Sequence, residues 1–420
     1  MKKFLTLALA LLMAMSMTSV SLAEGDAADL TMWIFPFSTD ETANQEREMY
    51  DEMIAEFEAA NPGITMTIEI IPWNNRETKM LTAIAANSGP DIMYLNTDIL
   101  KLFQAYGVLA PITDYVSDET LAEYEQSLLD GSVLLDGELY GLPCLIDLGT
   151  PCYNLDLLAE IGMTEEDLPT TWDEYDAMLA ALDEAGIDGV YFNYSLGLIS
   201  SYMYAMFFSE GCDVVTDDGE VVVDNEAGRK CIERAISWYQ NGYTPADSLS
   251  IADNDAYFIS GQVASTLSSA GAGFYTRIAP TLDFNWAAGP ILQGDAGQYG
   301  ISTVAALGVS RTCENVEAAA KWCEFFVEND RNAQWCAFGG YISPKTGATQ
   351  VEGEAYEVIL SNLDAVRGEP NHAVSRTLAN AWTATFQSMV SGSIDFETGL
   401  ATIKADMETL VADVEALTNG

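Results

Sequence analysis

Histidine, basic residues and long hydrophobic runs are scarce in this chain, and each shortage excludes a class of function. His372 is the only histidine and no C-x-x-C pair occurs, so a structural zinc site is not expected. Only 17 lysines and arginines accompany 64 acidic residues, which gives a formal net charge of −47. Such a field repels nucleic acid and anionic membranes. We therefore expect no metal, no cofactor and no nucleic-acid partner.

Catalytic signatures are absent as well. The sequence contains no G-x-S-x-G, no H-E-x-x-H and no G-K-[ST] phosphate loop. A dinucleotide-binding loop at Gly271-Ala272-Gly273 fails because Thr276 stands where glycine or alanine is needed. A glycosidase would need two carboxylates roughly 5 Å or roughly 6.5–9.5 Å apart, and 64 acids provide such pairs by chance. The sequence favours a binding protein over an enzyme.

The one long hydrophobic run stands at the N-terminus. Lys2 and Lys3 precede an apolar stretch over residues 4–20, and Ser21-Leu22-Ala23 has the small residues that a signal peptidase reads. We predict a signal peptide over residues 1–23, cleaved after Ala23, and export to the periplasm, the cell surface or the medium. An uncleaved membrane anchor is the alternative. No other stretch approaches the roughly 18 apolar residues of a transmembrane helix.

Seven cysteines leave at least one thiol unpaired if the chain is exported. Most of them have apolar neighbours, which is typical of small buried hydrophobic residues. Disulfides between Cys144 and Cys152 or between Cys212 and Cys231 are the alternative.

Strand and helix patterns alternate after the leader. Ile64, Met66, Ile68 and Ile70 alternate with polar residues, as in a half-buried strand. The expected strands are 30–35, 64–70 and 91–95, and the expected helices are 44–60, one around 80–84, and 99–106. Strands that alternate with helices at these lengths predict a parallel sheet covered on both faces.

A second region begins after residue 150. Thr171 and Glu174 form a capping box, which predicts a helix that ends at Gly186. Further helices are expected at 225–242, 314–329 and 395–417, and strands at 258–267 and 284–288.

Several segments resemble landmarks of the extracellular solute-binding proteins of ABC importers, the family that includes maltose-binding protein. They occur in the order and at the spacing of that family. The segments are 57–64 (FEAANPGI), 88–92 (SGPDI), 137–143 (GELYGLP), 151–158 (PCYNLDLL), 168–175 (LPTTWDEY), 258–264 (FISGQVA) and 339–344 (GGYISP).

The resemblance implies an α/β protein with the two-lobe, type II periplasmic-binding-protein fold, each lobe a mostly parallel sheet flanked by helices. One lobe would comprise 24–144 plus 303–340 and the other 148–298 plus 345–420, with hinge crossings near 144–149, 298–303 and 338–345. It implies a monomeric receptor that captures a carbohydrate in the cleft and passes it to two permease subunits with a cytoplasmic ATPase. Many members carry a lipid-modified cysteine after the leader, whereas the first cysteine here is Cys144.

Ligand-binding residues are expected just past the carboxyl ends of the parallel strands. Sugars need aromatic faces for their C–H groups and acids or amides for their hydroxyls. Asp98 and Asp147 match positions at which maltose-type members have ligand-binding acids, and Trp33 matches a position at which they have tryptophan. Phe35-Pro36-Phe37, in contrast, replaces a polar loop of the family. The first-lobe and hinge candidates are Trp33, Phe35, Trp73, Asn74, Asn96, Asp98 and Asp147.

In the second lobe, Tyr202 falls where the family has an aromatic platform. Gly271 stands where the family has a glycine-tryptophan platform, and Phe274 is the substitute for that tryptophan. Tyr299 and Tyr341, near the crossings, are further candidates.

Other interpretations stay open at this point. Trp33 and Trp73 could be core residues, and Asp98 could be the N-cap of the helix through Phe103. Trp172, Trp238 and Trp322 lie on amphipathic helices and are expected in the core. The alternative functions are a secreted carbohydrate-active hydrolase, a binding protein for a non-sugar solute, and a surface adhesin or signalling receptor with the same fold.

Overall fold

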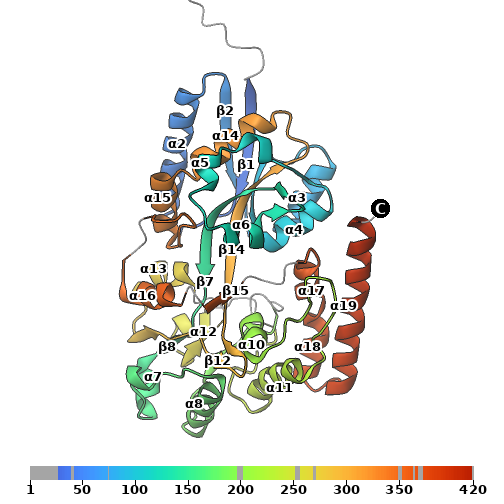
Figure 1. Ribbon diagram of the computed structural model, residues 1–420. Helices are drawn as coiled ribbons and strands as arrows, with labels where there is room; N and C mark the ends of the chain where they lie inside the picture. The colour runs from blue at the N-terminus through green and yellow to red at the C-terminus, as the bar shows by residue number, and fades with distance from the viewer. Residues whose placement is uncertain are drawn as a thin grey trace, which may run out of the picture.

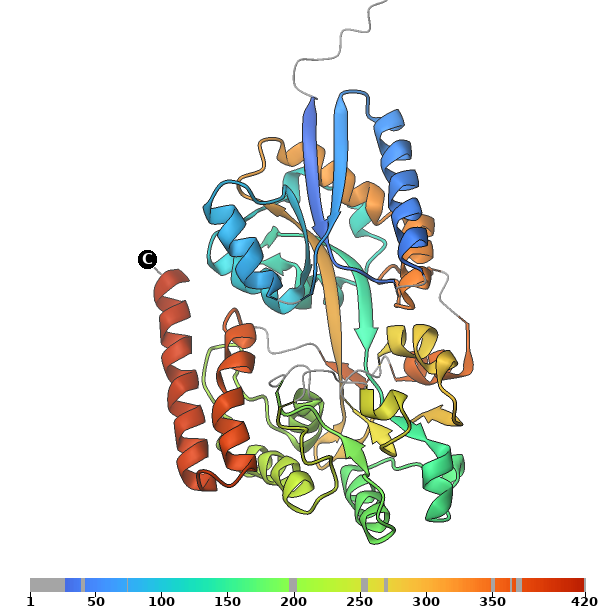
Figure 2. The same ribbon diagram turned by 180° about the vertical axis from the view of Figure 1, so that it is seen from behind.

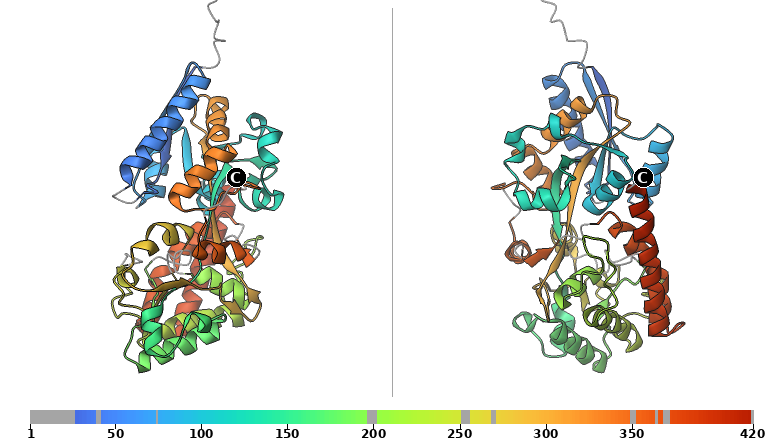
Figure 3. Two further views of the ribbon diagram at one scale, coloured as in Figure 1. Left: turned by 90° about the vertical axis from the view of Figure 1, so that its left-hand side faces the viewer. Right: turned by 45° about the vertical axis from the view of Figure 1, so that its right-hand side comes forward.

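The computed structural model consists of two bodies joined by long strands, as Figure 1 and the reverse view in Figure 2 show. It describes residues 27–38, 42–73, 75–195, 202–250, 256–267, 271–348, 352–362, 365–367 and 372–418. The predicted signal peptide and Asn74 lie outside these residues. The side views in Figure 3 separate the two bodies along the molecule. We call them the N-terminal lobe and the C-terminal lobe.

The N-terminal lobe is built around a sheet with the strand order β15-β14-β3-β1-β2, in which β14 also pairs with β4 and β7. Strand β1 is parallel to β2 and β3, and β14 runs antiparallel to β3, β4 and β7. In β2 the side chains of Ile64, Met66 and Ile68 are buried and those between them are exposed, as their alternation predicted. The strands are β1 (Ala28–Ile34), β2 (Ile64–Ile70), β3 (Ile92–Asn96), β4 (Leu109–Ala110), β7 (Leu142–Leu148), β14 (Gly300–Ser310) and β15 (Val366–Arg367).

Helices cover this sheet, and the expected ones form. Helix α2 buries Tyr50, Met53 and Phe57 along one face and ends beside Asn61, before Gly63. Trp322 on α14 is fully buried, as predicted. The helices are α2 (Ala43–Ala60), α3 (Arg76–Ala85), α4 (Thr97–Ala105), α5 (Asp118–Leu121), α6 (Gln126–Ser132), α14 (Val316–Phe326) and α15 (Asn329–Gly339), with the 3-10 turn η1 (Thr113–Tyr115) and the hairpin β5 (Leu134–Leu135) and β6 (Glu138–Leu139).

Two strands carry the chain between the lobes. β7 and β14 pair antiparallel from Leu142 opposite Leu307 to Leu148 opposite Ser302. Ile146 also bridges to Ile342, so a third segment passes the same place. β14 is antiparallel to β3 and β7 because it brings the chain back from the C-terminal lobe to the N-terminal lobe. The neck is therefore a hydrogen-bonded ribbon, which suits a hinge between two rigid bodies.

The C-terminal lobe has a smaller sheet with the strand order β11-β8-β10-β9. β10 is parallel to β9, and β8 runs antiparallel to β10 and β11. β8 is the reversed strand because it follows β7 from the neck without a crossover helix. Its strands are β8 (Cys152–Asn154), β9 (Val190–Tyr191), β10 (Ser265–Thr266) and β11 (Trp286–Ala288), with the hairpin β12 (Gln293–Gly294) and β13 (Gly297–Gln298).

Helices make up most of this lobe. Thr171 and Glu174 form both bonds of the predicted capping box at the start of α8. Trp172 and Trp238 are buried, as expected. The helices are α7 (Leu155–Glu160), α8 (Trp172–Glu184), α10 (Met203–Glu210), α11 (Glu226–Gln240), α12 (Ala256–Ile259), α13 (Ala272–Arg277), α16 (Glu354–Ser361), α17 (Ser375–Ala381), α18 (Thr383–Val390) and α19 (Phe396–Thr418), with the 3-10 turns η2 (Glu165–Asp167) and η3 (Ala279–Thr281).

The strand predicted over 258–267 is wrong over most of its length. Phe258 lies in the short helix α12, and only Ser265 and Thr266 form a strand. Gly261 explains the difference, because its φ of 71° makes a left-handed turn between the two elements. The expected strand at 284–288 is confirmed only from Trp286 onward.

The hydrophobic interior divides in the same way as the sheets. One core cluster contains buried residues from 30–145 and 305–336. A second combines 153–301 with 374–414, and a third, smaller cluster spans 148–359 around the neck side of the C-terminal lobe. This division supports the lobe boundaries expected from the sequence, which stay a prediction.

All seven cysteines are buried, and none of them forms a disulfide. Their interpretation as small hydrophobic residues is confirmed, and neither Cys144–Cys152 nor Cys212–Cys231 is a disulfide.

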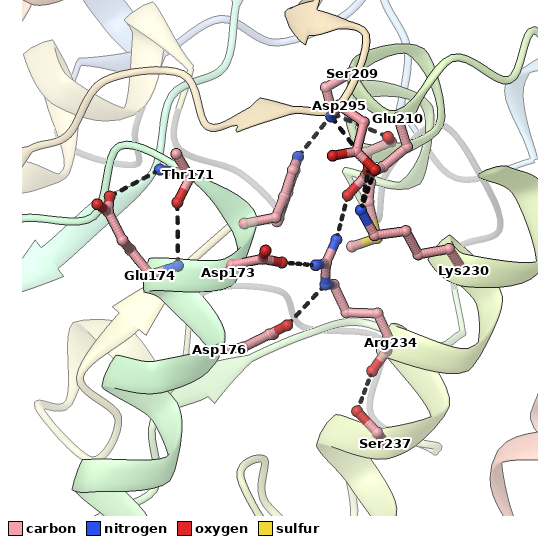
Figure 4. A network of polar contacts seen from close by, with 12 residues as sticks. Thr171, Asp173, Glu174, Asp176, Ser209, Glu210, Lys230, Arg234, Ser237 and Asp295 are labelled. Atoms are coloured by element: carbon pink, nitrogen blue, oxygen red, sulfur yellow. Dashed lines mark hydrogen bonds and ion pairs between the residues drawn. The ribbon is translucent and has the colours of Figure 1, made fainter.

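A polar network centred on the buried side chains of Arg234 and Glu210 holds three helices of the C-terminal lobe together (Figure 4). Arg234 on α11 pairs with Asp173 and Asp176 on α8 and with Glu210 at the end of α10. Lys230 pairs with Glu210 and with Asp295 in the β12–β13 turn. A hollow on the surface of α11 is lined in part by Lys230 and Arg234. Both side chains are already paired with carboxylates, so we do not treat this hollow as a candidate ligand-binding site.

Candidate functional site

Aromatic rings gather where the first strands of the N-terminal lobe end. Phe35 follows β1 and stacks on Trp73, which follows β2, with ring centroids 4.5 Å apart. Tyr94 on β3 contacts both rings edge-on at 5.7 and 6.2 Å. Phe35 is only 1% exposed, whereas Trp73 is 38% exposed. The cluster therefore presents the Trp73 ring to solvent at the carboxyl edge of the sheet, as expected for a ligand platform.

Two cations lie against this cluster. The guanidinium carbon of Arg76 is 4.8 Å from the Trp73 ring centroid and 5.2 Å from that of Phe35. The Lys79 ammonium is 4.8 Å from the Trp33 ring. Burial and the neighbouring Arg376 lower the pKa of Arg76, while Asp98 opposes that shift. Such contacts between cations and rings are stabilising when they are partly desolvated.

Asp98 is buried at the first turn of α4, at the point where the two lobes meet. Its Oδ2 atom lies 3.5 Å from Arg376 on α17 of the C-terminal lobe, and its Oδ1 atom has no hydrogen-bond partner. Arg376 also pairs with Glu77 on α3 at 2.5 Å. The N-cap position of α4 belongs to Asn96, whose side chain makes no capping bond, so the N-cap alternative for Asp98 is wrong.

Asp147 lies on β7 in the neck. Its Oδ1 atom accepts a hydrogen bond from the backbone N–H of Ala272 at 2.9 Å, at the start of α13. Burial raises the pKa of Asp147 to about 6, against the opposing effects of that N–H and of Arg277. Gly271 allows this close approach, because a Cβ atom at this residue would lie 2.5 Å from Asp147 Oδ1 and the carboxylate would have to shift.

Arg277 connects the lobes on the same side. Its Nη1 atom donates to the Phe37 carbonyl oxygen of the N-terminal lobe at 2.8 Å, and Nη2 donates to the Tyr341 hydroxyl at 3.2 Å. Tyr341 contacts Phe37 edge-on at 5.6 Å. A guanidinium from α13 is thus joined to the loop after β1 and to the third neck segment.

The structure therefore brings part of the predicted set together. One group combines Phe35 and Trp73 with the cations, and Asp98 is linked to it electrostatically. Asp147, Gly271 and Tyr341 form a second group around Arg277. Both groups lie where residues of one lobe contact residues of the other.

The remaining predicted residues lie elsewhere or are buried. Trp33 is 8% exposed in the core of the N-terminal lobe, beside Lys79, and Asn96 is half-buried. Tyr202 packs edge-on against Trp172, and its hydroxyl donates to the Gly149 carbonyl oxygen. Phe274 is buried and its ring contacts those of Phe258 and Tyr275. Tyr299 is half-buried beneath the guanidinium group of Arg367.

Sequence reasoning missed the arginines of the site. Arg76, Arg277 and Arg376 were not among the expected residues, and all three contact other candidates. Arg76 carried a usable signal, because a cation three residues after Trp73 is unusual in a chain with 64 acids. Arg376 carried none, since only the fold brings α17 to α4.

No group of three or more histidine, cysteine, aspartate or glutamate side chains could hold a metal ion within the described part of the chain. The site is instead a set of rings, carboxylates and guanidinium groups. This composition suits recognition of a polar, ring-shaped molecule.

The comparison with known proteins gives the family. The model of the bacterial extracellular solute-binding protein family matches residues 43–333. The chain belongs to this family. Its family and its fold are those of binding proteins of ABC transporters, which act outside the cytoplasm.

The relatives of this solute-binding protein are distant in sequence. It is 27% identical over 330 residues to a Brucella abortus (strain 2308) protein described only as a binding protein, covering 76% of this chain and 77% of the relative. It is 24% identical over 345 residues to the maltodextrin-binding protein MdxE of Bacillus subtilis (strain 168), covering 79% and 78%.

Solved structures show the same fold. An ABC substrate-binding protein of Listeria monocytogenes, in complex with cycloalternan, matches with a TM-score of 0.79 at 19% identity over 92% of this chain and 100% of its own. The maltose-bound MalE3 of T. maritima matches at 0.77 and 20% identity, over 91% and 100%. The expected two-lobe, type II fold of this solute-binding protein is confirmed.

Among the described residues, this solute-binding protein has no helix with the length and apolar character of a membrane span.

Proposed function

We propose that this chain is an exported receptor of an ABC importer that captures a carbohydrate between its two lobes. The lobes, bounded as the sequence predicts at 24–144 plus 303–340 and 148–298 plus 345–420, close on the sugar. The closed form is then recognised by two permease subunits that work with a cytoplasmic ATPase. The receptor acts as a monomer after cleavage of the leader near Ala23.

This proposal is based on two features of the site. One is the solvent-exposed ring of Trp73, and the other is a buried carboxylate oxygen of Asp98 that lacks a hydrogen-bond donor. Trp73 is exposed although its neighbour Phe35 is buried. Asp98 Oδ1 is buried without a hydrogen-bond partner. A sugar supplies what both groups lack, because its C–H face packs on an aromatic ring and its hydroxyl groups donate to a carboxylate.

The named ligands of relatives support the same ligand class. The Bacillus relative is a maltodextrin-binding protein, and the Listeria and T. maritima structures contain cycloalternan and maltose. Burial of a polar group without a partner costs free energy, which binding sites recover when the ligand arrives.

The test is titration calorimetry of the protein lacking residues 1–23 against a panel of mono- and oligosaccharides, with amino acids, polyamines and metal ions as controls. A sugar of the right class should bind, and Trp73→Ala should weaken it by about tenfold, since a stacked ring contributes on the order of 1 kcal/mol or more. The matched control is Tyr115→Ala, which removes a ring that is 43% exposed in η1 and outside the site.

Two of the alternatives can be recognised with the same panel of compounds, with an assay for reducing sugar added. Binding of a non-sugar solute would replace the ligand class, and slow release of reducing sugar from an oligosaccharide would indicate a hydrolase. An equal loss in Trp73→Ala and Tyr115→Ala would remove Trp73 from the site.

A further inference from the structure

The few cations of this chain are not evenly neutralised. The lysines and arginines of the described residues mostly form ion pairs with carboxylates, for example Arg229, Arg234, Arg331 and Lys345. Within the same part of the chain, Arg76 and Lys79 form no ion pair, and their recorded contacts are with aromatic rings. Among those residues, Arg47 and Arg277 also form no ion pair, but each donates a hydrogen bond to a backbone carbonyl oxygen. Arg76 and Lys79 differ because their contacts are with rings alone.

Arg76 is also almost completely buried. Arg76 as a whole residue is 9% exposed. Among the described residues its guanidinium contacts the Phe35 and Trp73 rings and makes no hydrogen bond. Burial lowers its pKa, and so does repulsion from Arg376. A guanidinium offers five N–H donors in a rigid fork that matches a carboxylate or sulfate group. An anionic ligand group would relieve both the desolvation and the repulsion.

The backbone around Arg76 points to the same chemistry. Arg76 is the first residue of α3, a helix of 10 residues, and Asn75 before it has a left-handed φ of 58° and provides no side-chain cap. The first N–H groups of a helix have no partner within the helix and carry a partial positive charge. Anions bind at such ends, particularly where a cationic side chain stands beside them.

The neighbouring carboxylates do not cancel this charge. Glu77 and Asp98 both contact Arg376, which takes up part of their charge. Arg76 and Lys79 are thus the cations left over at the corner between α3, α4 and α17. This corner contains the exposed Trp73 ring and the Asp98 Oδ1 atom that lacks a partner.

We propose that the carbohydrate carries an acidic group, a carboxylate or a sulfate ester, which binds Arg76 at the N-terminus of α3. The sugar ring packs on Trp73, one hydroxyl donates to Asp98 Oδ1, and Lys79 adds positive charge beside the ring of Trp33. This inference rests on the proposed function and adds the charge of the ligand.

The experiment measures affinity for three matched probes by calorimetry on the protein lacking residues 1–23. The probes are a trisaccharide of galacturonic acid, a sulfated galactose trisaccharide and a neutral galactose trisaccharide. We expect an acidic probe to bind at least about tenfold more tightly than the neutral one, because hydrogen bonds to charged groups are the stronger ones. We expect its affinity to fall as salt is raised, while the neutral probe changes little.

Three variants locate the effect. Arg76→Gln should reduce the ratio of acidic to neutral affinity by about tenfold or more, and Arg76→Lys should retain part of that ratio because it keeps the charge and loses the fork. Arg311→Gln is the control, because it removes a cation beyond the far end of β14, beside Gly107, and should leave the ratio unchanged. Melting curves of the ligand-free variants show that each is folded.

The outcomes separate the two proposals. Preference for the carboxylate or for the sulfate probe supports the inference and identifies the group. Binding of the neutral probe alone, or an equal loss of the ratio in Arg76→Gln and Arg311→Gln, contradicts the inference and leaves the receptor function standing. If none of these or the wider sugar panel binds, both the inference and the carbohydrate function fail.

Discussion

At the residue scale, the burial of Asp147 in the neck makes its charged form unfavourable. The carboxylate is held in the interior by one backbone N–H of α13 and by the field of Arg277, and burial still raises its pKa to about 6. Its ordinary value is 3.8. The charged form is therefore less stable in the folded protein than in the unfolded chain, by roughly 3 kcal/mol.

Replacement of Asp147 by Asn should stabilise the protein at neutral pH. The unfolded chain loses this proton near pH 3.8 and the folded one near pH 6, so Asp147 lowers the free energy of unfolding as pH rises from about 4 to about 6. The difference in this free energy between Asp147→Asn and the parent protein should grow over that window, by on the order of 2–3 kcal/mol, and stay level above it. Thermal melting across pH 3–8 measures it.

The other 63 acidic residues titrate in both proteins, and their contributions cancel in that difference because only Asp147 is changed. A difference that is flat or that falls with pH would mean that the contact with Arg277 outweighs burial.

At the scale of elements, ion pairs fix the helices of the C-terminal lobe to one another. The Arg234 side chain is 7% exposed and that of Glu210 is 1% exposed, whereas the Lys230 side chain is 36% exposed. Figure 4 shows Arg234 reaching the helices α8 and α10 from α11. A buried carboxylate that loses its cation is costly, whereas an exposed pair contributes little.

Arg234→Met should therefore reduce the free energy of unfolding by about 3–5 kcal/mol, because it leaves Glu210 buried beside Asp173 and Asp176 with less compensation. Lys230→Met is the matched variant and should cost about 1 kcal/mol or less, since Arg234 still pairs with Glu210. Denaturant unfolding of both variants gives the two values. Equal losses would show that the network does not depend on the burial of Arg234.

At the scale of the whole molecule, two arginines of the C-terminal lobe contact the N-terminal lobe. Arg277 reaches the carbonyl of Phe37, and Arg376 reaches Glu77 and Asp98. Phe37, Glu77 and Asp98 lie outside the neck strands β7 and β14, which alone would allow the bodies to rotate. In hinge proteins such contacts favour the closed arrangement.

Combined replacement of Arg277 and Arg376 by Ala should open the ligand-free protein. Small-angle X-ray scattering should show a larger radius of gyration than in the parent, because the closed arrangement loses charge-assisted hydrogen bonds that the open one does not make. The control is Arg47→Ala with Arg311→Ala, two cations of the N-terminal lobe outside the contact between lobes. Equal radii for both double variants would show that other contacts hold the lobes.

The sequence alone determined the elements with a strong local pattern and the family. Alternating residues predicted β2, apolar spacing predicted α2, and the capping box predicted α8, because in each case neighbours in the chain carry the whole signal. The landmarks over most of the chain indicated the solute-binding family, which the match over 43–333 bears out. The strand expected at 258–267 failed where one glycine turn outweighed an apolar run.

The tertiary structure decided which candidates meet and how they are charged. The ends of the predicted strands indicated Trp73, Asp98 and Asp147 as site residues. The burial of Tyr202 and Phe274 could not be predicted in this way, because it depends on packing against segments that are distant in the sequence. The pairing of Arg376 with Glu77, almost three hundred residues away, left no trace in the local pattern. Local patterns record the preferences of neighbouring residues, whereas burial, repulsion between cations and contact between lobes arise only when distant segments are brought together.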